Sequence, residues 1–181
     1  MKLSRKLAIC LTLALGASIP VYAQEESNFS KLTIDLGVVV KDLDRSIEFY
    51  TKAIGFTKVG HFDVPTATAT DAGLTNSKDL SIDVLTLGAG EGATSLKLME
   101  LPEVIAREAN NNFIHSQFGF SYITIHVKDT AKAMARLEAA GVKPIAKGPV
   151  ELPASLGAGV YLTVVKDPDG NFVELVGPSS K

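Results

Sequence analysis

Hydrophobic and polar positions follow two periods in the first half of the chain. Branched apolar residues at 32–40 indicate a strand that ends at Lys41 and Asp42, and apolar residues then recur at helical spacing until Gly55. Further strands are expected at 56–62, 80–87 and 94–101, with a glycine-rich hairpin turn at 88–92. The polar stretch 66–77 is expected to form either a lid or an exposed loop. The order of these elements is β-α-β-β-β.

The same order returns in the second half. A β-branched strand is expected at 121–127, a helix capped by Asp129 and stopped by Gly141, and strands near 142–146, 160–165 and 171–176. The spacing from the capping aspartate to the glycine is 13 residues in the first half (Asp42 to Gly55) and 12 in the second. This agreement indicates an internal duplication.

One such unit would leave a sheet face uncovered, so two units must cooperate. We therefore predict an α+β fold in which two tandem βαβββ units pair to form a curved sheet cleft. The predicted domain covers 32–177, with unit one at 32–101, a connector at 102–119 and unit two at 120–177.

The N-terminal segment is typical of a targeting signal. Lys2, Arg5 and Lys6 precede an apolar stretch at 7–18, and small residues stand before a cleavage point after Ala23. We predict a secretory signal peptide at 1–23 and a polar leader at 24–31. The expected location is periplasmic or secreted.

Composition and charge narrow the function classes. The apolar share of 46% and the charged share of 21% fit an ordinary globular domain. Without the signal peptide the chain has 15 lysines and arginines against 20 acidic residues, a net charge of −5. That charge disfavours nucleic acid, and no membrane association is expected after the signal is removed. Cys10, the only cysteine, lies in the signal, so neither a disulfide nor a thiol nucleophile is expected.

Two motifs resemble a known family. They are Val-Lys-Asp-Leu-Asp-Arg-Ser-Ile-Glu-Phe-Tyr at 40–50 and Asp-Pro-Asp-Gly-Asn-Phe-Val-Glu-Leu at 167–175. Together with the duplication, they resemble the vicinal oxygen chelate superfamily, which includes glyoxalase I, extradiol dioxygenases, fosfomycin-resistance enzymes and bleomycin-binding proteins. The resemblance covers 32–177 and implies a glyoxalase-like fold.

The resemblance also implies a divalent metal held by the first and last strands of each unit. It maps the ligands onto Asp35, Glu100 and Glu174, with Tyr122 at the fourth position. A phenol with a pKa of about 10 is a poor ligand at neutral pH, so Tyr122 is assigned to substrate instead. An all-oxygen set suits Mg²⁺ or Mn²⁺, while Zn²⁺ and Ni²⁺ stay open. The alternative is that Glu100 and Glu174 only reach water at strand ends.

Two classes of function follow from the resemblance. In the first, the protein is a metal-dependent lyase or isomerase of the glyoxalase kind, and Glu174 moves a proton on a small oxygen-bearing substrate. In the second, it binds or sequesters a small molecule without a metal, as bleomycin-binding proteins do. Tyr122, Thr124 and Phe172 are the expected ligand contacts. Pairing of the two units within one chain or between two copies in a homodimer is left open.

Overall fold

The computed structural model describes residues 30–179. The elements below all belong to one compact part of the chain, which begins at Lys31. The predicted signal peptide at 1–23 and nearly all of the predicted leader at 24–31 lie outside the described residues. Among the residues that are described, no helix has the length and apolar character needed to cross a membrane.

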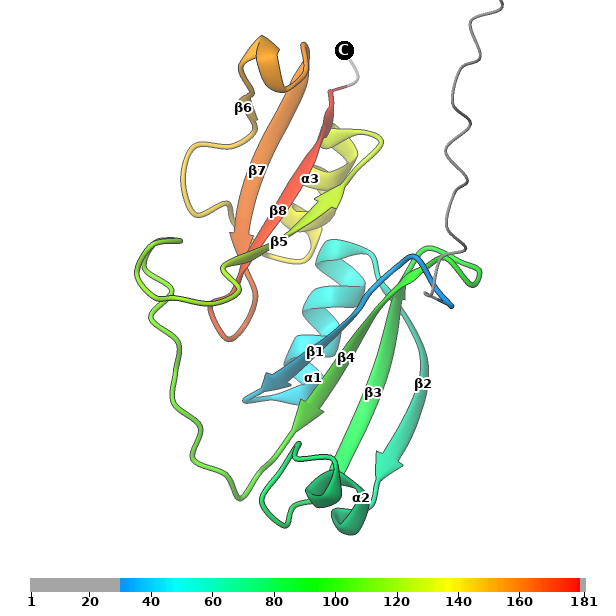
Figure 1. Ribbon diagram of the computed structural model, residues 1–181. Coiled ribbons are helices and arrows are strands. Elements are labelled where there is room, and N and C mark those ends of the chain that lie inside the picture. Colours follow the sequence, from blue (N-terminus) through cyan, green and yellow to red (C-terminus); the bar gives the residue numbers. More distant parts are fainter. Residues whose placement is uncertain (1–29, 180–181) are drawn as a thin grey trace, which may run out of the picture. The chain divides into compact units, whose positions relative to one another are not determined.

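The first half of the domain forms one four-stranded sheet (Figure 1). Its order is β1-β4-β3-β2, in which β1 is parallel to β4 and the other pairs are antiparallel. The helical segments are α1, the π-helical turn η1 that continues it, and α2. In chain order the elements are β1 (Asp35–Val40), α1 (Leu43–Glu48), η1 (Phe49–Ile54), β2 (Thr57–Val64), α2 (Thr66–Asp71), β3 (Leu80–Leu87) and β4 (Thr94–Glu100).

The second half repeats this arrangement with the order β5-β8-β7-β6 (Figure 1). Here β5 is parallel to β8, as β1 is to β4. The predicted α+β fold of two tandem βαβββ units is therefore confirmed. In chain order the elements are β5 (Tyr122–His126), α3 (Thr130–Ala139), β6 (Val150–Glu151), η2 (Ala154–Leu156), β7 (Val160–Lys166) and β8 (Phe172–Pro178).

One predicted strand is wrong. Residues 142–146 form no strand, and the edge position belongs to the short β6 at Val150–Glu151. Prolines at 144, 149 and 153 surround this edge, and proline has no N–H to donate to a sheet. The Ile145 N–H still donates to the Val164 carbonyl of β7 at 3.0 Å, but the strand ladder with β7 forms at Val150–Glu151.

Both helices begin where the sequence predicts. The side chain of Asp42 accepts a hydrogen bond from the Arg45 N–H at 3.0 Å, and that of Asp129 accepts one from the Ala131 N–H at 2.9 Å. These caps satisfy amide groups that have no partner in the first helical turn. Gly55 ends the first helical segment in a left-handed conformation, with φ 102°, that suits glycine.

One hydrophobic core joins the two βαβββ units. It contains Leu96 and Leu98 from the first sheet, Val173 and Leu175 from the second, and buried side chains of η1 and α3, with partly buried side chains of α1 packed against it. Arg136 of α3 donates a hydrogen bond to the Ala53 carbonyl of η1 at 3.0 Å. Each sheet therefore turns one face, its inward face, to this core. We call the opposite faces outward; they carry Asp35, Lys97 and Met99 in the first sheet and Tyr122, Thr124 and Glu174 in the second.

The helix α2 packs on part of the first outward face. Its Ala69 is fully buried in a small cluster with Leu80 and Ile82 of β3, and Met99 of β4 packs against this cluster. The polar stretch at 66–77, expected as a lid or an exposed loop, thus begins with a helix fixed on the sheet. It covers the Met99 end of this face.

Candidate functional site

The two sheets carry different residues at one equivalent outward position. Gly37 and Thr124 each lie five residues before the capping aspartate of their unit. In the parallel pairs, Gly37 is opposite Lys97 and Thr124 is opposite Glu174. Lys97 is therefore the structural counterpart of Glu174.

An ion pair lies at this position in the first sheet. The Lys97 ammonium is 3.0 Å from one carboxylate oxygen of Asp35, and the Lys31 ammonium is 3.1 Å from the other. The hydrogen bond from Lys97, followed by that from Lys31, holds the pKa of Asp35 below its usual value. About a third of each side chain in the Asp35–Lys97 pair is exposed, so the pair faces solvent. Two ammonium groups against one carboxylate leave this patch with one positive charge.

The second outward face carries a carboxylate in a polar setting. Glu174 accepts a 2.7 Å hydrogen bond from the Thr124 hydroxyl, and the nearby Tyr122 is 49% exposed. Phe172 is only 5% exposed, and the Lys166 ammonium lies 5.0 Å from its ring centre. Of the three predicted ligand contacts, Tyr122 and Thr124 are accessible beside Glu174 and Phe172 is covered.

Glu100 lies on the inward face of the first sheet. It is opposite the buried Val40, and its carboxylate accepts a hydrogen bond from the Leu43 N–H, the first of α1, at 3.0 Å. Asp35 is on the outward face at the other end of the β1–β4 pair. One chain therefore does not bring together the three predicted metal ligands Asp35, Glu100 and Glu174. No group of three or more histidine, cysteine, aspartate and glutamate side chains suited to a metal occurs within 30–179.

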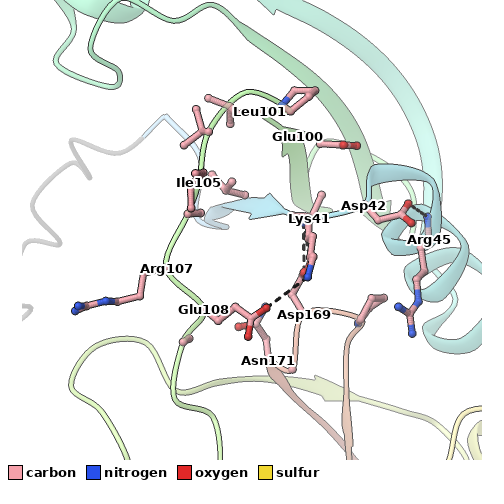
Figure 2. Close-up of a pocket in the computed structure, with 18 residues that line it drawn as sticks. Lys41, Asp42, Arg45, Glu100, Leu101, Ile105, Arg107, Glu108, Asp169 and Asn171 are labelled. Atoms are coloured by element: carbon pink, nitrogen blue, oxygen red, sulfur yellow. Dashed lines mark hydrogen bonds and ion pairs between the residues drawn. The ribbon is translucent and has the colours of Figure 1, made fainter.

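A pocket of about 1000 Å³ lies beside Glu100, under the segment that joins the two units (Figure 2). Its charged groups largely pair with one another. The Lys41 N–H donates to Asp169 at 3.3 Å, and the Lys41 ammonium is 3.5 Å from Glu108. Figure 2 shows Arg107 pointing away from these groups. Burial raises the pKa of Asp169 above its ordinary value, although the Lys41 N–H opposes this rise. The pocket is large enough for a small ligand, but its carboxylates have structural partners.

The motif at 167–171 ties the two βαβββ units together. The buried Asp167 accepts a hydrogen bond from the Tyr50 hydroxyl at 2.9 Å and others from Asp169 and Asn171 N–H groups at 3.0 and 2.7 Å. Burial, together with the Asp167 charge, raises the pKa of Tyr50, so its hydroxyl stays protonated and donates. This motif therefore serves the fold.

A further polar cluster lies on β2 and β3, and no motif in the sequence indicates it. Asp83, 5% exposed, pairs with the Lys58 ammonium and with Nδ1 of His61, both at 2.9 Å. Burial acts to raise the pKa of Asp83, but the hydrogen bonds from Lys58 and His61 outweigh it, so the pKa is lowered. Nε2 of His61 lies 3.4 Å from the Ser81 hydroxyl and 3.3 Å from Asp63. The carboxylate of Asp63 competes with Ser81 for this nitrogen, so the cluster is an ion-pair network that compensates a buried charge.

The outward positions do not fit a divalent metal. The family resemblance expects metal ligands on the first and last strands, where the register places Asp35, Lys97, Tyr122 and Glu174. An ammonium has three N–H donors and no lone pair to give to a metal, and its charge repels a dication. Asp35 already uses both oxygens for ammonium groups. Among these four residues, Glu174 is therefore the one carboxylate still available to a metal.

Comparisons with known proteins agree with this fold. The family model of the Glyoxalase/Bleomycin resistance protein/Dioxygenase superfamily matches residues 33–175. The chain is 29% identical to a lactoylglutathione lyase of Pseudomonas putida over 151 residues, which cover 77% of this chain and 81% of that protein.

Solved structures show the same architecture. A glyoxalase family protein from Bacillus cereus has a TM-score of 0.66 at 19% identity, covering 87% of this chain and all of that one. A glyoxalase I mutant from Zea mays has a TM-score of 0.57 at 23% identity, with 82% of this chain matched to 46% of that protein. At these identities, the likeness establishes the fold.

Proposed function

The chain belongs to the Glyoxalase/Bleomycin resistance protein/Dioxygenase superfamily, and from this premise we propose that it binds a small oxygen-bearing molecule between outward sheet faces of two copies. The observation that carries the proposal is the single core. Because both inward faces pack on that core, the two outward faces of one chain point away from each other. A cleft between a first and a second outward face therefore needs another copy.

Exposed apolar side chains support this pairing. Leu32 and Ile34 precede the first strand of one sheet, Phe118 and Phe120 precede that of the other, and all four are highly exposed. Val39 adds an apolar side chain on the first outward face. Large, highly exposed apolar side chains beside both sheets favour contact with another protein. The charges agree, because the first face carries an excess ammonium and the second carries Glu174.

The polar groups of the paired faces suit a small ligand. The Tyr122 hydroxyl, the Glu174 carboxylate and the Lys97 ammonium would border one hollow, which combines donors and acceptors with apolar walls. A ligand with several oxygen atoms can use all three groups.

A second candidate function is a lyase reaction of the lactoylglutathione lyase type. The relative from Pseudomonas putida favours it, as does Glu174, whose carboxylate could accept a proton as a general base. In this case Glu174→Gln abolishes formation of lactoylglutathione while dimerisation persists. If the wild-type protein forms lactoylglutathione no faster than the uncatalysed reaction does, binding remains as the function.

Sedimentation velocity tests the paired site. A glutamate on the first outward face, Val39→Glu, is expected to weaken dimerisation at least tenfold, because it buries an unpaired charge in the interface. The matched control is Ile145→Glu, since Ile145 is about as exposed but lies outside both outward faces. A wild-type protein that stays monomeric at every concentration would contradict the proposal.

We also propose that the protein is exported by its N-terminal segment. The basic head and apolar stretch at 1–23 support this proposal. Mass spectrometry of the protein from its native cell should find an N-terminus at Gln24, and an intact Met1 would contradict export.

A further inference from the structure

We propose that the Lys97 ammonium stands in place of the divalent metal in this site, between Asp35 of its own chain and Glu174 of a second copy. The inference rests on the two-copy site proposed above. It concerns the chemistry of that site, which the family membership alone does not determine.

The first step is the position of Lys97. The parallel register sets Lys97 opposite Gly37, as it sets Glu174 opposite Thr124. The pseudo-equivalent outward positions of the two sheets thus carry opposite charges. When the first outward face of one chain packs against the second outward face of another chain, Lys97 and Glu174 border the same cleft.

The second step is the charge balance. The first face has an excess positive charge, since Lys31 and Lys97 share the single carboxylate of Asp35. On the second face, Thr124 is the hydrogen-bond donor to Glu174, and no lysine, arginine or histidine of residues 30–179 forms an ion pair with this carboxylate. Glu174 is only partly exposed, so a cation on the facing sheet would stabilise its negative charge. Lys97 supplies that cation.

The third step is the class of ligand. A divalent metal can coordinate two neighbouring oxygens at once, whereas a lysine ammonium donates hydrogen bonds from one compact charge. Lys97 has donors left after its bond to Asp35. The site therefore suits a small molecule that presents one anionic oxygen, such as a carboxylate or an enolate, with the Tyr122 hydroxyl as a second partner.

A charge substitution tests this assignment through metal binding. Lys97→Glu places a carboxylate at the position that Glu174 has in the other sheet, which gives the site three carboxylates. After equilibrium dialysis against Mn²⁺, we expect the wild-type protein to hold less than a tenth of an ion per chain and K97E to hold about one. Lys97→Gln, which removes the ammonium without adding a carboxylate, should bind none, and Lys128→Glu is the control for added charge.

Dimerisation gives an independent readout. In the presence of a chelator, K97E should dimerise at least tenfold more weakly than the wild-type protein, because the introduced carboxylate and Glu174 repel each other. Mn²⁺ should restore the K97E dimer, and the charge swap K97E/E174K should restore it without metal. Circular dichroism checks that each variant is folded, and the charge swap keeps the test decisive if K97E alone does not fold.

The outcomes separate the two proposals. A wild-type dimer that holds one Mn²⁺ per chain, lost in Glu174→Gln, overturns the role of Lys97 and leaves the two-copy site intact. A folded K97E dimer that binds no Mn²⁺ and is as stable as the wild type also overturns it. A monomeric wild-type protein removes the two-copy site itself.

Discussion

The two sheets of this domain pack their inward faces in the same way but carry different polar residues on their outward faces. Both have a parallel pair formed by their first and last strands, and both bury alternate apolar residues of these strands in one core. On the outward side, Asp35 and Lys97 stand where the second sheet has Tyr122 and Glu174. A duplicated fold can thus keep the same packing in both βαβββ units while each unit contributes different side chains to a site.

The largest effect is expected from the shared core. Leu98→Ala and Leu175→Ala remove fully buried side chains from the two sheets, and each should cost about 2–5 kcal/mol of unfolding free energy. Because the core is common, either variant should unfold in a single transition by urea denaturation, followed by circular dichroism. Two separate transitions would show that the sheets are stabilised independently.

A smaller effect is expected from the tie between the units. Tyr50→Phe removes the hydroxyl that donates to the buried Asp167 and should cost about 1–3 kcal/mol, since the carboxylate loses a partner. Urea denaturation measures this change. Tyr161→Phe is the matched control on the second sheet, and an equal loss there would mean that the Asp167 contact is not the cause.

The helix caps should contribute about equally in the two units. Asp42→Ala removes the acceptor for the Arg45 N–H and should cost about 1 kcal/mol. Thermal unfolding of this variant and of Asp129→Ala compares the two caps, with Asp44→Ala as an exposed control in the same first turn. Loss of stability in D44A as large as in D42A would point to the helix dipole rather than the cap.

The smallest effect concerns the pH dependence of Asp35. Its pKa is lowered in the folded protein, so its ion pairs stabilise the fold above the unfolded pKa. That contribution is lost as the pH falls through the folded pKa. An NMR titration of the side-chain carboxyl should give a midpoint below 3.8 that rises in Lys97→Gln. A midpoint unchanged by the substitution would contradict the pairing.

Much of the fold follows from the sequence, because apolar periodicity and capping residues are local signals. The predicted strand at 80–87 matches β3, and the helices begin directly after Asp42 and Asp129 as expected. The edge strand was misplaced, since its bounds depend on which residues β7 can reach between prolines. Within 142–146 the Ile145 N–H does bond to the Val164 carbonyl of β7, but no local pattern indicates that this contact does not extend into a strand.

The site was harder to predict because it depends on register. The sequence Leu98-Met99-Glu100-Leu101 resembles Phe172-Val173-Glu174-Leu175. However, Glu100 lies three residues after the true counterpart of Glu174, and an odd shift moves a side chain to the other face of a sheet. A local signal was nonetheless present. Glu174 lies between the buried Val173 and Leu175, and the residue that lies between the buried Leu96 and Leu98 is Lys97.

The common core has a consequence for how such a protein can change. The exposed segment at 101–121 is the covalent link, yet either half alone would leave its helix uncovered on one side, so neither half is expected to persist as a separate protein. The solvent side of each sheet is free of that restriction. New chemistry can therefore arise there one side chain at a time, in one half, while the mutual support of the halves preserves the scaffold.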